Sequence, residues 1–257
     1  MSLSRTALES ALRRDRLTLA VVLIGIPLTC WLWVILMARD MYGPMTGSSE
    51  WMMTMVWDMP RLLLLWAMWA AMMAAMMLPS ATPFVLLYAG AARRRQSRPA
   101  LAIYALGGGY LLVWTLFSLG ATALQRILSQ LLLLTPMMEP ASPLAGATML
   151  LVAGAYQLTP LKRVCLQSCR SPLSFLMSRW RTGVSGAFRM GVEHGMYCVG
   201  CCWALMLVLF AGGVMNLTVI LGLTLWVIVE KLAPFGEQSA RLSGALLVAF
   251  ALWLVLR

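Results

Sequence analysis

Six cysteines and a single histidine are the residues of this 257-residue chain that are best suited to bind a metal ion. Five of the cysteines fall into two groups, one in "PLKRVCLQSCRSP" and the other, together with the histidine, in "GVEHGMYCVGCCW". Thiolate sulfur and imidazole nitrogen are ligands for soft and borderline transition ions. The two groups therefore predict a metal site, with the following candidate ligands: Cys165, Cys169, His194, Cys198, Cys201 and Cys202.

The second group lies in an apolar stretch that reads as a helix. At about 100° per residue, His194, Cys198 and Cys201 fall within an arc of roughly 60°, and Cys202 lies about 40° further on. A rise of about 1.5 Å per residue separates His194 from Cys201 by about 10 Å along the axis, too far to share one ion. A straight helix offers adjacent pairs only, so the helix must open at its glycines or another segment must supply ligands.

The first cysteine group is the expected supplier. Cys165 and Cys169 stand four residues apart, so one helical turn would direct both sulfurs the same way. We predict a site of Cys165, Cys169 and Cys198 with His194 or Cys201 as fourth ligand. Two alternatives stay open: the later cysteines are small packing residues of a membrane helix, and the earlier pair are unused thiols.

Two acidic residues lie at about the depth of the cysteines. Carboxylates in membrane segments are costly, so each needs a structural or functional reason. Glu193 and Glu230 are candidates to orient His194 or to accept protons released when thiols bind metal. The alternative is local pairing with Lys231 or Arg189.

Methionine is abundant, with 21 residues. Met68, Met72 and Met76 recur every fourth residue and form one helical ridge, and Met73 and Met77 form a second ridge beside it. Thioethers are soft ligands that suit Cu(I), so this ridge is a possible copper relay. Copper is favoured over zinc because thioethers are plentiful and histidine is scarce. The alternative is that the methionines are flexible packing residues.

The elements that position these residues are expected to be membrane helices. The chain is 61% hydrophobic and 11% charged, a balance that excludes an ordinary water-soluble domain. Continuous apolar runs favour helices over a barrel, so the expected fold is an all-α membrane protein with about seven transmembrane helices in one domain, 1–257. The predicted spans are 17–37, 61–89, 101–125, 143–159, 190–212, 215–232 and 241–257. Pro79 and Pro83 predict a tilt, a kink or an early end of the second span near residue 80.

Basic residues set the expected orientation. With a cytoplasmic N-terminus, the arm 1–16 and the cysteine-containing loop 160–189 are both cytoplasmic, and every inner loop is basic. The net charge of +11 is then explained by contact with an anionic lipid bilayer, not by nucleic acid. The first apolar run reads as an anchor because it is longer than a signal peptide core. Segment 126–142 is too short to span and is expected at the interface or as a re-entrant loop.

Four motifs carry a resemblance: "AMMLPSATP", "YQLTPLKRVCLQSC", "GVEHGMYCVGCCW" and "VEKLAP". Together they resemble a bacterial family of uncharacterised, predicted metal-binding integral membrane proteins, over roughly residues 60–257. The resemblance implies metal binding at the cysteines and histidine named above. It supplies no reaction or substrate.

These observations predict a multi-pass protein of the bacterial cytoplasmic (inner) membrane that handles copper in transport or delivery and is not an enzyme. A metallochaperone or another membrane subunit is the expected partner. A membrane thiol–disulfide oxidoreductase is the first alternative, although its dithiols would face the reducing cytoplasm. The second alternative is a structural or assembly partner whose helices are locked by metal.

Overall fold

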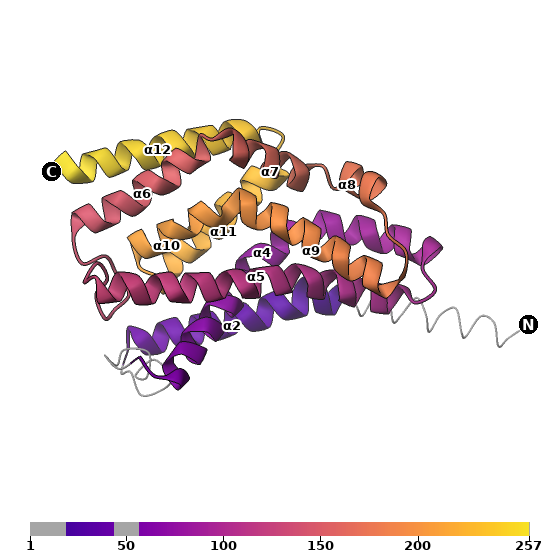
Figure 1. The fold of residues 1–257 in the computed structure, drawn as a ribbon, viewed down its shortest axis with the longest axis horizontal. Helices are drawn as coiled ribbons and strands as arrows, with labels where there is room; N and C mark the ends of the chain where they lie inside the picture. The colour runs from indigo at the N-terminus through magenta and orange to yellow at the C-terminus, as the bar shows by residue number, and fades with distance from the viewer. Residues whose placement is uncertain (1–18, 44–56, 257) are drawn as a thin grey trace, which may run out of the picture.

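The structure, a computed structural model, describes residues 19–43 and 57–256, so the N-terminal arm 1–16 lies outside the described residues. Within these ranges the chain is helical, no strand forms, and an isolated β-bridge joins Leu134 to Pro140. The helices lie side by side along the long axis of the molecule (Figure 1). In chain order they are a π-helical turn Val21–Gly25, α2 (Ile26–Met41), α4 (Met59–Arg95), α5 (Pro99–Gln130), α6 (Pro143–Gln157), α7 (Pro160–Arg170), α8 (Pro172–Arg179), α9 (Gly183–Cys202), a 3-10 turn Trp203–Met206, α10 (Leu207–Gly212), α11 (Leu217–Leu232) and α12 (Gly236–Leu256).

The helices include several that are long and apolar enough to cross a membrane. By length and composition the described residues contain five: Val21–Met41, Met59–Arg95, Pro99–Gln130, Gly183–Gly212 and Gly236–Leu256. A sixth results if α6 and α7, which are bent by 66° at their junction, count as one span. The 16-residue α11 is short for a span. The all-helical prediction is confirmed for these residues, whereas the predicted count of seven spans is not.

Helix α4 continues through both of its prolines for 37 residues and does not end near residue 80, one of the outcomes that the sequence left open. Pro79 has no N–H group, so the carbonyl of Ala75 loses its usual partner within the helix. The indole Nε1 of Trp31 on α2 donates to that carbonyl at 3.1 Å. A neighbouring helix therefore repairs the hydrogen bond that the proline removes, as membrane helices often require.

Helices α5 and α9 share the most extensive helix contact of the bundle. A Cβ atom at Gly109 of α5 would overlap the backbone of Phe188, and one at Gly191 of α9 would overlap the backbone of Leu106. Small residues let the two backbones approach closely, which is a common way for membrane helices to pack. This contact holds the cysteine-bearing helix α9 in place.

Segment 160–189, expected as a loop, is mostly helical. It contains α7, α8 and the first turns of α9. The side chain of Thr159 caps α7 by accepting a hydrogen bond from the backbone N–H of Lys162. Helix α7 packs against α9, so the segment delivers its cysteines to the side of that helix.

Segment 126–142 begins as the last turn of α5 and ends in a compact loop. Leu132 and Met138 adopt positive φ angles of 57° and 59°, which fold this loop back on itself. The loop is tied to the turn after α10, because the N–H of Val214 donates to the carbonyl of Met138 at 3.2 Å.

Candidate metal centre

Four cysteine sulfurs meet where α7 packs on α9. The Sγ of Cys201 lies 3.8 Å from that of Cys169 on α7 and 3.3 Å from that of Cys202. The thiol of Cys201 also donates to the backbone carbonyl of Cys198 at 3.2 Å, and the sulfur of Cys198 lies near the other three. We call these four residues the thiol group. All of its cysteines are free thiols, and the three on α9 are buried.

The end of α9 brings Cys202 into this group. The residue has φ −121° and ψ −13°, which are not helical values, and the 3-10 turn Trp203–Met206 follows directly. The helix therefore changes its path at Cys202, and not at Gly195 or Gly200, where local opening was one of the two alternatives. This departure sets the sulfur of Cys202 beside that of Cys201, a contact that an ideal helix would not make between neighbouring residues.

Cys165, one of the predicted ligands, does not join the thiol group. Its sulfur lies against the backbone of α9, where a Cβ at Gly200 would come within 2.7 Å of it. In the described part of the chain no sulfur contact joins Cys165 to the other four cysteines. Helix α7 thus turns one of its two cysteines, Cys169, toward the group.

His194 is also separate from the sulfurs. Its buried ring stacks on Phe84 with ring centroids 3.9 Å apart, and the edge of Phe175 on α8 packs against it at 5.5 Å. Its Nδ1 atom has no hydrogen-bond partner among the described residues. The histidine therefore belongs to an aromatic cluster one helical turn before Cys198 and is not placed as a ligand alongside the sulfurs.

Lys231 and Tyr110 contact the thiol group, although nothing in the sequence pattern placed them there. The Nζ of Lys231 lies 2.9 Å from the Sγ of Cys198 and 3.0 Å from the Oγ of Ser80. The hydroxyl of Tyr110 lies 2.9 Å from the same sulfur and donates to the carbonyl of Met77 at 3.1 Å. An ammonium group beside a sulfur stabilises negative charge on it. Lys231 therefore faces sulfur, and the alternative in which it pairs with a carboxylate is not seen.

Glu230 pairs with Lys162, a residue expected on the inner surface. The two side chains are each 1% exposed and their charged atoms are 2.6 Å apart. The other carboxylate oxygen accepts hydrogen bonds from Gln157, Trp226 and Ser243 at 2.7–3.2 Å. The same Nζ of Lys162 also donates to the backbone carbonyl of Cys201 at 2.6 Å. This buried ion pair connects α6, α7, α11 and α12 to the backbone of the thiol group.

Glu193 lies outside the site. Its carboxylate pairs with Arg181, in the segment between α8 and α9, at 2.9 Å and with Arg179, the last residue of α8, at 3.5 Å. Glu193 therefore forms a local pairing, as in the alternative interpretation, but with partners other than Lys231 or Arg189. The carboxylate shows no hydrogen bond to His194 among the described residues, so the expected role in orienting that ring is not seen.

The methionines of α4 lie in the same buried core as the thiol group. Met68, Met72, Met73, Met76 and Met77 are each fully buried. Met77 is at the midpoint of α4 and is linked to Cys198 through Tyr110. The thiol group is thus level with the middle of α4. From Met77 the two ridges lead about 13 Å back along α4 to Met68.

The donor atoms of the thiol group suit a soft metal ion, but the present positions of the sulfurs do not yet form a complete binding site. In the described part of the chain, no three His, Cys, Asp or Glu side chains are arranged to hold one ion as they stand. Two sulfurs that each bind an ion at about 2.3 Å are about 3.8–4.0 Å apart in tetrahedral or trigonal geometry. The Cys169–Cys201 separation of 3.8 Å already meets this requirement, and the sulfurs of Cys201 and Cys202, now 3.3 Å apart, would need to separate by about 0.5–0.7 Å.

Comparison with known proteins identifies the family. Residues 66–254 match the family model PpoB2, described as a copper chaperone. Searches of curated proteins and of solved structures found no match. A chaperone carries its metal and does not convert a substrate, in agreement with the expectation that the chain is not an enzyme. The matched region contains the thiol group, the contact of Lys231 with Cys198, the Lys162–Glu230 ion pair and the methionine ridges. Because the match covers most of the chain, this protein belongs to the PpoB2 copper chaperone family.

Proposed function

We propose that this protein is a membrane-embedded copper chaperone that binds Cu(I) as cargo at Cys169, Cys198, Cys201 and Cys202. The observation that carries the proposal is the meeting of four free thiols from two helices beside the ammonium group of Lys231. Thiolates are the protein ligands that Cu(I) prefers. The predicted ligands Cys165 and His194 are left out of this proposed set because the structure holds them apart from it.

The charges around the thiol group favour a monovalent ion. A buried site is stable only when its net charge is balanced. If two of the four sulfurs bind Cu(I) as thiolates and the other two remain thiols, the site carries a net charge of −1, which the ammonium group of Lys231 neutralises. Four thiolates with Zn(II) carry −2, and the nearby Lys162 is already paired with Glu230. The site is therefore better balanced for copper than for zinc.

The methionine ridges support transfer of the cargo. Thioethers bind Cu(I) more weakly than thiolates and exchange it readily, so a row of buried methionines can pass an ion onward. The ridges lead from the thiol group toward Met59, the end of α4 opposite the basic residues 93–95. We place the protein in the bacterial cytoplasmic membrane as a multi-pass protein with a cytoplasmic N-terminus. A metallochaperone or another membrane subunit would then load or receive the copper.

Copper titration of the purified protein under anaerobic, reducing conditions tests this function. Cu(I) is added in competition with a colorimetric chelator, and bound metal is counted for the wild type and for single Cys→Ser variants. We expect the variants C169S, C198S and C202S each to lose affinity by tenfold or more. The matched controls C165S and C30S should bind like the wild type, because neither sulfur belongs to the thiol group.

The result that would overturn the proposal is full copper affinity in both C169S and C198S. A purely structural role predicts a different pattern, in which copper raises the melting temperature but is not released to an acceptor. Transfer from the loaded protein to a second, stronger chelator distinguishes delivery from a structural role.

A further inference from the structure

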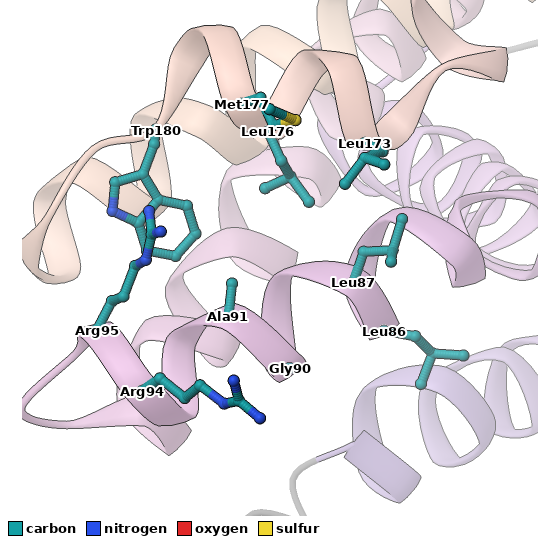
Figure 2. Close-up of a pocket in the computed structure, with 10 residues that line it drawn as sticks. All are labelled: Leu86, Leu87, Gly90, Ala91, Arg94, Arg95, Leu173, Leu176, Met177 and Trp180. Atoms are coloured by element: carbon teal, nitrogen blue, oxygen red, sulfur yellow. The ribbon is translucent and has the colours of Figure 1, made fainter.

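A cavity of about 670 Å³ lies between the second half of α4 and helix α8, away from the thiol group (Figure 2). Its volume falls within the roughly 300–1,000 Å³ of small-molecule sites in proteins. The copper proposal assigns it no role.

The α8 side of the cavity is apolar and uncovered. Leu173 and Met177 of α8 are 60% and 78% exposed, Leu87 of α4 points toward Leu173 across the cavity (Figure 2), and Leu86 lines the same cavity. Gly90 adds space between the helices, because a Cβ atom there would meet nothing within 4 Å. In a membrane protein, such an exposed apolar surface is suited to pack against the hydrocarbon chain of a lipid.

The other end of the cavity is cationic. Arg94 and Arg95 line it, and none of its lining residues is acidic. The guanidinium of Arg95 lies over the ring of Trp180, 5.6 Å from its centroid, so this side chain is held in place (Figure 2). Guanidinium groups bind phosphate oxygens in a planar, two-point fashion, and tryptophan is enriched at membrane interfaces.

The order of these residues along α4 matches the order of groups in a lipid. Leu86 and Leu87 come first, Gly90 follows, and the two arginines come about 12 Å beyond the leucines along the helix. This end of α4 is also the basic end of the bundle, which favours the anionic surface of a membrane. A ligand with a hydrocarbon chain and a negatively charged head would therefore satisfy both ends of the cavity.

We propose that the cavity between α4 and α8 binds one anionic phospholipid, with the phosphate on Arg94 and Arg95 and an acyl chain along the leucines. The inference rests on the membrane location proposed above but not on copper binding. Phe175 of the same helix α8 packs against His194, so a lipid bound to α8 also helps to keep Phe175 over the ring of that histidine.

Native mass spectrometry of the full-length protein tests the site. Detergent-purified protein is incubated with phosphatidylglycerol or with phosphatidylcholine of the same acyl chains, and retained lipid is counted. The wild type should retain one phosphatidylglycerol in preference to phosphatidylcholine. The double variant R94Q/R95Q should weaken this retention about 30-fold, as expected for the loss of two contacts with an anionic lipid. The control R98Q/R189Q removes the same charge from exposed positions that do not line the cavity.

A second pair of variants tests the apolar half without changing charge. Gly90→Leu fills the cavity and should reduce retention of phosphatidylglycerol by tenfold or more. The control Gly120→Leu adds the same side chain on α5, where it also meets open space. Equal retention of the two lipids by the wild type, or unchanged retention in both R94Q/R95Q and G90L, would overturn the proposal. Copper titration of the same variants keeps this result separate from the fate of the copper site.

Discussion

Replacing Lys162 by methionine should destabilise the protein by about 3–5 kcal/mol, because it leaves the buried carboxylate of Glu230 without its charged partner. The two charged atoms are 2.6 Å apart and both side chains are 1% exposed, so water cannot solvate the carboxylate that is left. A loss of about 3–5 kcal/mol lowers the ratio of folded to unfolded protein by roughly 150- to 5,000-fold. The methionine fills most of the space of the lysine stem, which limits any packing contribution to this loss.

The double variant K162M/E230Q isolates the charge effect. Replacing both charged partners removes the buried, uncompensated carboxylate, and such replacements are often close to neutral. The amide oxygen that E230Q introduces can still accept a hydrogen bond from Trp226 or Ser243, which contact Glu230 at 2.9 and 3.2 Å. We therefore expect the double variant to recover at least half of the stability lost in K162M.

Unfolding in mixed micelles with increasing SDS, followed by tryptophan fluorescence, measures these differences. The control is Arg163→Met, which removes an exposed positive charge from the neighbouring position of α7. Exposed substitutions of this kind change stability by about 0.5 kcal/mol or less. The reasoning is refuted if K162M is as stable as R163M, or if the double variant is no more stable than K162M.

Three further predictions concern the site and the packing around it. Lys231→Met should weaken Cu(I) binding about 10- to 150-fold in the chelator competition, because a hydrogen bond from a charged group contributes about 1.5–3 kcal/mol; unchanged affinity would contradict the proposed charge balance. The double variant M72L/M76L should bind Cu(I) normally but release it more slowly to an acceptor in stopped-flow measurements, since Leu and Met have similar volumes; an unchanged rate would exclude these thioethers from the relay. Gly109→Ala should lower the melting temperature because its Cβ overlaps the backbone of α9, whereas Gly108→Ala, whose Cβ meets open space, should not; equal melting temperatures would contradict the close α5–α9 contact.

The choice of ligand chemistry followed from residue types alone. Cysteine and methionine are abundant near one another and histidine occurs once, so the sequence indicated a soft ion before any contact was known. The copper chaperone family agrees with that prediction. Helical periodicity also placed Cys198 and Cys201 on one stripe, and their interaction in the structure agrees with it.

The contacts between helices could not be predicted from the sequence in the same way. Cys165 and Cys169 stand four residues apart and both lie against α9, but the position of α7 along α9 decides that Cys169, and not Cys165, meets the thiol group. Lys162 reads as one of many inner basic residues, yet it is buried with Glu230. The sequence offered only a weak indication of this pair: a carboxylate in an apolar segment such as Glu230 needs a cation as partner, and several basic residues were available.

The sequence by itself determined that this chain forms helices and carries soft metal ligands, because long apolar runs must satisfy their backbone hydrogen bonds internally and because ligand softness belongs to the side chain. Tertiary structure alone decided that Cys202 enters the site through the break after α9, that Lys231 faces sulfur, and that α11 is too short to add a clear span. These outcomes depend on how helices rotate, cross and end against one another, which are properties of pairs of segments and not of any single stretch of residues.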